Sequence, residues 1–88
     1  MTRVKAISFP GIRAWFYSND HIPPHFHIQK AGEWEAKVEF LSDVGDMFKF
    51  EPWSTVPSSR LVRRMEKIVA LRRESILDEW SKIHEARS

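Results

Sequence analysis

Hydrophobic and polar positions follow two different periods along this chain. Between Glu33 and Phe40 apolar and charged residues alternate strictly, which is typical of a strand that buries one face. After Pro57 the period becomes helical, and apolar residues recur every seven positions at Val62, Val69, Ile76 and Ile83. We therefore predict a single domain over residues 1–88, with a sheet part (1–57) and a helical part (58–86).

Shorter segments complete the predicted sheet. The turn at Pro10-Gly11 separates two runs of β-favouring residues, which is a hairpin signal. The strands expected in addition to residues 33–40 are 4–8, 12–17, 25–30 and 47–51. The helix is expected over about 59–85, either unbroken or bent near Arg72–Ser75, where the apolar stripe thins. The predicted fold class is α+β: an antiparallel meander of four or five strands, covered on one face by a long C-terminal helix.

The segment DHIPPHFHIQK, residues 20–30, concentrates side chains that can bind metal or transfer protons. Its two adjacent prolines exclude helix and impose extended backbone, so a strand can begin directly after them. Because side chains alternate along a strand, His25 and His27 share one face, and Phe26 and Ile28 share the other. If the two apolar residues join the core, both histidines lie on the face that points away from it.

The hairpin that follows needs an odd number of loop residues to keep its apolar side chains on one face. We predict a three-residue loop at Lys30-Ala31-Gly32, with Gly32 in the left-handed conformation. The expected cross-strand partners are Phe26 with Ala36, Ile28 with Trp34, His27 with Glu35 and His25 with Lys37. A loop displaced by one residue pair would instead place His25 opposite Glu39. In both registers the histidine face meets an acidic row.

Three interpretations of the histidine segment stay open. Imidazoles and a carboxylate can bind a divalent metal such as zinc, nickel or manganese, and the candidate ligands are His25, His27 and Glu35. The same region could supply a general acid and base, with candidate catalytic residues His21, His25, His27 and Asp20. Charge on a phosphate would then be stabilised by Arg13 or Lys37. The third interpretation is a rigid corner that serves structure or recognition, in which Asp20 caps a turn. The spacing H-x₃-H-x-H is not a strong metal signature.

Composition narrows the classes of function. No cysteine occurs among the 88 residues, which excludes disulfides, thiolate zinc sites and cysteine nucleophiles. The first residues lack the apolar run of a signal peptide, and no stretch reaches the length of a membrane span. We therefore expect a soluble cytoplasmic protein that does not contact a membrane. No cofactor is expected apart from the candidate divalent metal.

Charged residues are distributed in blocks. Residues 31–57 hold six acidic and two basic side chains, whereas residues 58–73 hold six basic and one acidic. This basic stretch is the candidate surface for RNA, DNA or a partner protein, and its cations are Arg60, Arg63, Arg64, Lys67, Arg72 and Arg73. A small core together with four tryptophans and a long apolar stripe predicts surplus apolar surface. We therefore expect a homodimer or a complex with a small partner protein.

The stretch FYSNDHIPPHFHI, residues 16–28, resembles the signature of a small bacterial family, domain of unknown function 4160. The family pattern D-H-x-P-P-H-F-H is kept at each fixed position, and the segment LRRESILDEW resembles the family's C-terminal helix. The resemblance implies no established reaction. It implies a small intracellular protein that has a protein partner in a toxin–antitoxin-like pair and acts on RNA or DNA. A histidine that is common in the family's helix is replaced here by Arg72, which weakens a catalytic role.

The leading hypothesis from the sequence is a binding module of a toxin–antitoxin-like pair, which contacts a partner protein, nucleic acid or both. The alternative is a small nuclease, either metal-assisted or based on histidine acid–base chemistry, centred on the DHIPPHFH motif. A third class is a structural subunit whose motif only shapes an interface. No phosphate-binding glycine loop or nucleophile motif in the sequence favours the enzyme.

Overall fold

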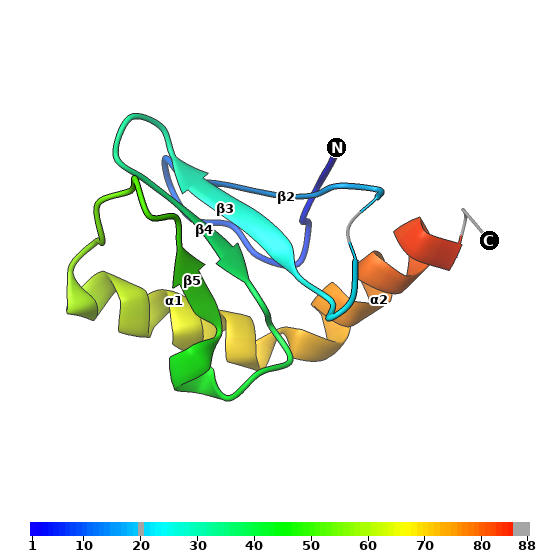
Figure 1. The fold of residues 1–88 in the computed structure, drawn as a ribbon. Coiled ribbons are helices and arrows are strands. Elements are labelled where there is room, and N and C mark those ends of the chain that lie inside the picture. The colour runs from blue at the N-terminus through cyan, green and yellow to red at the C-terminus, as the bar shows by residue number, and fades with distance from the viewer. Residues whose placement is uncertain (20, 86–88) are drawn as a thin grey trace.

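The computed structural model describes residues 1–19 and 21–85, with only the backbone of Glu85, and its centre is one antiparallel sheet (Figure 1). Each strand pairs with the next along the chain, in the order β1-β2-β3-β4-β5. The strands are β1 (Thr2–Arg3), β2 (Arg13–Phe16), β3 (Phe26–Lys30), β4 (Trp34–Val38) and β5 (Phe48–Phe50). A short 3₁₀ helix, η1 (Val44–Asp46), precedes β5. The predicted α+β meander is confirmed.

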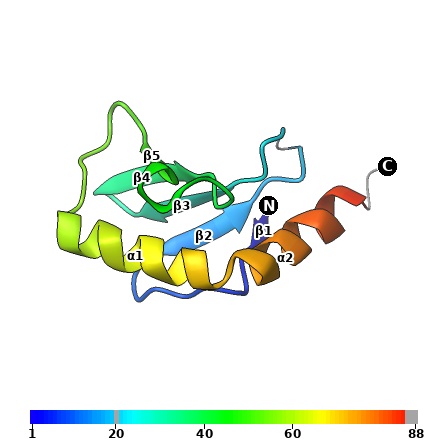
Figure 2. The ribbon, with the colours of Figure 1, turned by 90° about the horizontal axis from the view of Figure 1, so that it is seen from below.

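Two helices, α1 (Ser59–Leu71) and α2 (Arg73–Glu85), cover one face of the sheet (Figures 1 and 2). α1 begins after Ser58, whose hydroxyl accepts a hydrogen bond from the Leu61 amide and so satisfies one of the amides that lack a helical partner. The two helices are separated at Arg72, where the backbone leaves helical geometry with φ −112° and ψ 13°. Of the two sequence alternatives, the bent helix is therefore the one observed.

The core lies between the helices and the facing side of the sheet. Fully buried side chains from β3 and β4 meet Met65, Val69 and Ile76 from the helices. The predicted core residues Trp34, Val38, Val69 and Ile76 are buried, and Phe48, Phe50 and Trp80 pack against them half-buried. At the start of α1, Leu61 rather than the predicted Val62 packs against the core. A helix turns by 3.6 residues rather than 3.5, so a strict seven-residue count drifts around the helix.

The first predicted strand, residues 4–8, is wrong. β1 ends at Arg3, and one further ladder bond joins the Val4 amide to the Ala14 carbonyl. The next two amides, of Lys5 and Ala6, donate instead to the two carboxylate oxygens of Glu79 on α2, at 2.7 and 2.8 Å. Because these amides bind the helix, the chain after Val4 no longer pairs with β2. It reaches the start of β2 through a turn in which Gly11 has φ +73°.

The β3–β4 register differs from the first predicted alignment and agrees with the displaced one. The observed partners are Phe26 with Val38, His27 with Lys37, Ile28 with Ala36, Gln29 with Glu35 and Lys30 with Trp34. The loop has three residues, as expected, but consists of residues 31–33 rather than 30–32. Gly32 has φ +75°, and the Glu33 amide donates to the Lys30 carbonyl at 3.0 Å. This bond places the left-handed glycine at the centre of the loop, which moves every partner along by one pair.

Candidate functional site

The face of the sheet opposite the helices carries a connected cluster of rings, which we call the ring cluster: Trp15, Tyr17, His25 and His27. Trp15 and His27 are direct partners in the β2–β3 register, and their rings stack with centroids 5.9 Å apart. Tyr17 meets His27 edge-on at 4.8 Å, and the two histidine rings are 5.2 Å apart. The structure therefore brings together two of the predicted site residues and adds two aromatic residues to them.

His25 is the most constrained member of the ring cluster. The sequence places it on the face away from the core, yet its side chain is only 6% exposed. Its Nδ1 lies 2.9 Å from the Pro23 carbonyl oxygen, on the proline that follows the cis Ile22–Pro23 bond. Because a carbonyl only accepts hydrogen bonds, Nδ1 must carry the proton. Tautomer and ring orientation are thus set by the Pro-Pro corner.

The other predicted members of the site are distributed differently. His21 lies in the loop before β3 and is exposed to solvent, whereas His25 is buried. Asp20 lies outside the described residues. Glu35 faces Gln29, which donates to its carboxylate at 3.2 Å, whereas His27 faces Lys37. Across residues 1–19 and 21–85, no group of three His, Asp or Glu side chains has an arrangement that could hold a metal ion.

On β4 and β5, two lysines of this open face share one acid. The Glu39 carboxylate is only 16% exposed and lies 3.4 Å from the Lys37 ammonium and 3.9 Å from that of Lys49. Lys37 and Lys49 are cross-strand partners, so one acid serves two neighbouring cations. Of the two residues proposed to stabilise a phosphate, Lys37 is therefore engaged by Glu39, and the Arg13 guanidinium lies over the Trp15 ring at 5.3 Å. These contacts do not place Lys37 and Arg13 around one common catalytic centre.

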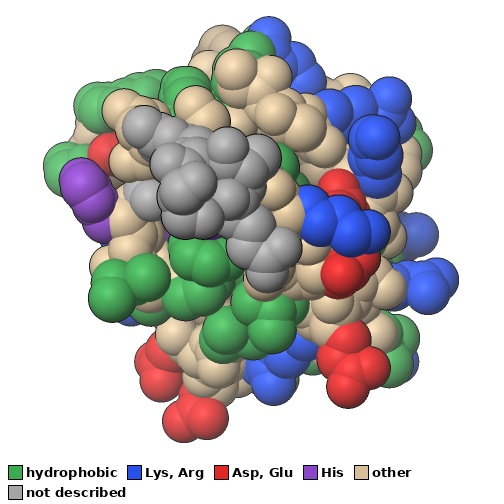
Figure 3. All heavy atoms as spheres, turned by 90° about the vertical axis from the view of Figure 1, so that its right-hand side faces the viewer, with side chains coloured by type: hydrophobic (Ala, Val, Ile, Leu, Met, Phe, Trp, Pro, Cys, Tyr) green, Lys and Arg blue, Asp and Glu red, His purple; other side chains and the backbone are tan. Residues whose placement is uncertain are grey.

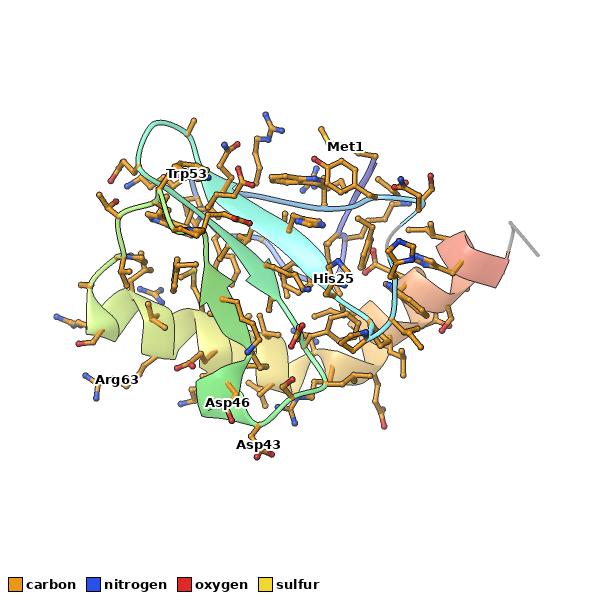
Figure 4. The ribbon with its side chains drawn as sticks, viewed as in Figure 1. Met1, His25, Asp43, Asp46, Trp53 and Arg63 are labelled. Atoms are coloured by element: carbon orange, nitrogen blue, oxygen red, sulfur yellow. The ribbon has the colours of Figure 1, made fainter. Side chains whose placement is uncertain are left out.

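The outer face of α1 carries the opposite arrangement of charge. Four of the predicted cations occupy positions i, i+3, i+4 and i+7 of the helix, are all exposed, and form what we call the cationic stripe: Arg60, Arg63, Arg64 and Lys67. None of the four makes an ion pair with another described residue. The one acid of α1, Glu66, is 8% exposed and lies off this stripe. Figure 4 shows the labelled Arg63 pointing away from the sheet.

The two remaining predicted cations separate at the helix break. Arg72 is exposed, whereas Arg73 is half-buried and its guanidinium donates to the Ser42 carbonyl. The same group lies 3.7 Å from the Met47 sulfur, so Arg73 ties α2 to the segment before β5. Of the six cations predicted to bind a ligand, Arg73 is thus the one whose guanidinium is used in a contact within the described fold. Seen from the end with the C-terminus, most Lys and Arg side chains lie on one side and the visible histidine lies on the other (Figure 3).

Sequence reasoning missed the aromatic half of the ring cluster. Trp15 and Tyr17 have the same parity along β2 as Arg13, so strand alternation alone places them opposite Phe16 and the core. That signal was present in the sequence. Their contact with the histidines depends on the pairing of β2 with β3, which alternation does not specify.

Together these features define a small α+β domain with an antiparallel meander, two helices on one face and a histidine-aromatic cluster on the other. The chain belongs to the family described as a domain of unknown function (DUF4160), whose model matches residues 11–81. The matched range includes both the ring cluster and the cationic stripe. No match was found among curated proteins, and none among solved structures. None of the described helices is long and apolar enough to cross a membrane.

Proposed function

We propose that this protein is a binding module of a toxin–antitoxin-like pair, and that its cationic stripe binds the phosphate backbone of nucleic acid. The observation that carries this proposal is the run of four exposed cations on one face of α1, without an acidic partner among the described residues. The membership in a pair rests on the family resemblance of the sequence. The protein acts by recognition in this proposal, and catalysis is not required.

The geometry of α1 suits a phosphate backbone. Its 13 residues form a rod of about 20 Å, and the i, i+3, i+4, i+7 spacing aligns the four cations on one side. Three of them are arginines, whose planar guanidinium can donate two parallel hydrogen bonds to one phosphate. Each cation that neutralises a phosphate releases condensed counterions, which makes the affinity fall steeply with salt. An acidic partner protein would use the same charge but has no regular phosphate spacing.

The partner protein of the proposed pair has a separate candidate surface. Trp53 and Val56 are each 67% exposed in the segment between β5 and α1. Large apolar side chains exposed to this extent favour contact with another chain. We propose that this surface binds another protein chain, which is either a second copy of this protein or a small partner protein.

The nuclease alternative has less support from the geometry. The ring cluster brings His25 and His27 together, but one of them is buried and hydrogen-bonded to its own turn. Glu35, the carboxylate predicted to bind metal with them, accepts a hydrogen bond from Gln29, and its backbone amide donates to the Ser54 hydroxyl. The four exposed cations of the cationic stripe lie on the outer face of α1, which is separated from the ring cluster by the sheet and the core.

The proposal is tested by fluorescence anisotropy with labelled duplex and single-stranded oligonucleotides over a range of KCl concentrations. Four phosphate contacts predict a slope of log K against log salt of roughly −3 to −4. The double variant Arg63→Gln/Arg64→Gln should reduce that slope by about 2 and weaken binding by roughly tenfold. The matched control is Arg3→Gln/Arg13→Gln, which removes two exposed arginines from the opposite face. Equal losses in both variants, or no salt-dependent binding, would overturn the proposal.

A further inference from the structure

A hollow of about 460 Å³ opens at the β1 edge of the sheet, where residues 5–12, between β1 and β2, do not pair with β2. The departure follows from the Glu79 carboxylate, which holds the Lys5 and Ala6 amides on the helix side. The chain returns through the bridge between Phe9 and Ile12, so the turn and the two strands enclose a space between them. The hollow is therefore a consequence of the irregular first segment.

The lining of this hollow combines an apolar floor with a cationic rim. Most of its residues are apolar, and they include Val4, Ile7, Phe9, Ile12 and Ala14. Two exposed arginines, Arg3 and Arg13, also line it, and none of the acidic residues that the structure describes does. Apolar walls with a few placed polar groups, in a volume of this size, are typical of small-molecule sites.

Trp15 adds a third polar group to the lining. Its side chain is 6% exposed, and its Nε1 is buried without a hydrogen-bond partner in the structure. A buried indole N–H normally has an acceptor, because an unpaired donor costs about 1–3 kcal/mol. Arg3 faces Trp15 across the β1–β2 pair, and the Arg13 guanidinium lies 5.3 Å from its ring centroid. Three residues with side-chain N–H donors, Arg3, Arg13 and Trp15, thus line the apolar hollow, and no acidic residue among those described does.

We infer that this hollow binds a small organic anion, a carboxylate attached to an apolar body. The carboxylate would accept from the guanidinium groups of Arg3 and Arg13 and the apolar body would fill the space beneath, with the Trp15 Nε1 as a further donor. Charge complementarity favours an anion, because the described rim carries two arginines and no acid. Most of the lining precedes residue 11, where the family match begins, so family membership does not account for the hollow.

The test uses the full chain with 4-phenylbutyrate as the probe and 4-phenylbutan-1-ol as its neutral match. We expect the acid to bind about tenfold or more tightly than the alcohol by calorimetry. In two-dimensional NMR, the Trp15 indole N–H signal should move on addition of the acid, together with backbone signals of residues 3–15. If Arg3 and Arg13 had only a structural role, addition of the acid would leave the Trp15 indole signal in place.

Three variants make the outcome decisive. Arg3→Gln/Arg13→Gln should bring the acid down to the affinity of the alcohol, and Ser8→Trp, at an exposed lining residue, should block both ligands. The control Arg63→Gln/Arg64→Gln removes the same charge from α1 and should leave binding unchanged. Equal binding of acid and alcohol, no binding of the acid at millimolar concentration, or shifts confined to other surfaces would each overturn the inference. Nucleic-acid binding through α1 is unaffected by any of these results.

Discussion

The open face of the sheet and the outer face of α1 both carry charged side chains, but they organise them in opposite ways. On the sheet, Glu39 lies between Lys37 and Lys49, and its carboxylate is largely shielded from solvent. On the helix, the cationic stripe has no acidic neighbour among the described residues. Pairing with Glu39 reduces the field of the lysines on β4 and β5, whereas the stripe projects its field into solvent.

Residue type alone therefore does not identify a binding surface. Lysine on β4 and β5 and arginine on α1 have similar charges, yet the sheet cations are partly satisfied by Glu39 and the helix cations are available to a ligand. A sheet places charged residues of adjacent strands about 5 Å apart, which favours alternation of sign on one face. A single solvated helix face has no such neighbours, so like charges can accumulate there. Three predictions test this difference.

The largest difference in stability should be seen between substitutions of two neighbouring residues whose side chains lie on opposite sides of β3. Phe26 is fully buried on the helix side, and its replacement by alanine should lower the free energy of unfolding by about 3–5 kcal/mol. His27, the next residue, is half-buried on the open face, and His27→Ala should cost about 1 kcal/mol or less. Urea denaturation of both variants measures the contrast. Similar losses would mean that the ring cluster is part of the folding core.

An intermediate effect should come from a charge that is used inside the fold. Glu79 accepts from two backbone amides of residues 5 and 6, and Glu79→Gln replaces one acceptor oxygen by an amide donor. We expect a loss of about 1–2 kcal/mol, since charge-assisted bonds to backbone are stronger than neutral ones.

The neighbouring variant Asp78→Asn is the matched control for Glu79→Gln. It removes only an exposed pair with Lys82, 3.0 Å long and one helical turn apart, which should contribute about 0.5 kcal/mol or less. Both variants are compared by thermal and urea denaturation under identical salt. A loss for Asp78→Asn as large as that for Glu79→Gln would show that helix charge, not the clamp on the first segment, determines the effect.

The smallest change in stability, and the sharpest test of the comparison, should come from Glu39→Gln. Removing this acid leaves Lys37 and Lys49 without their shared partner, so the sheet face should come to resemble the cationic stripe. We expect unfolding free energy to change by less than about 1 kcal/mol. The salt slope of nucleic-acid binding should become steeper by up to about 2. The control Glu33→Gln removes the exposed partner of Lys30 at the loop, and an equal gain there would indicate a nonspecific charge effect.

Much of the fold followed from local pattern. Strict alternation from Glu33 to Phe40 predicted β4 and its buried face, and the change of period after Pro57 predicted the helices. The apolar stripe left an unbroken and a bent helix open, and the structure has the bend, at Arg72. The exposure of the cationic stripe also followed from helical spacing, because the apolar stripe of the same helix defines which side is buried. These features depend on residues within a few positions of each other.

The candidate sites depended on contacts that local pattern does not contain. The register that sets His27 opposite Lys37 follows from where the left-handed Gly32 lies in its loop, and a shift by one pair changes every partner.

The fold class and the cationic helix face could be predicted from the order of residues, because backbone geometry and hydrophobic periodicity act locally. The ring cluster, the burial of His25, the contact of Arg73 with Ser42 and the hollow beside β1 arise from long-range packing. The hollow exists because Glu79 binds amides 74 and 73 residues away. Such contacts depend on how two distant segments meet in space, and neither segment alone specifies the meeting.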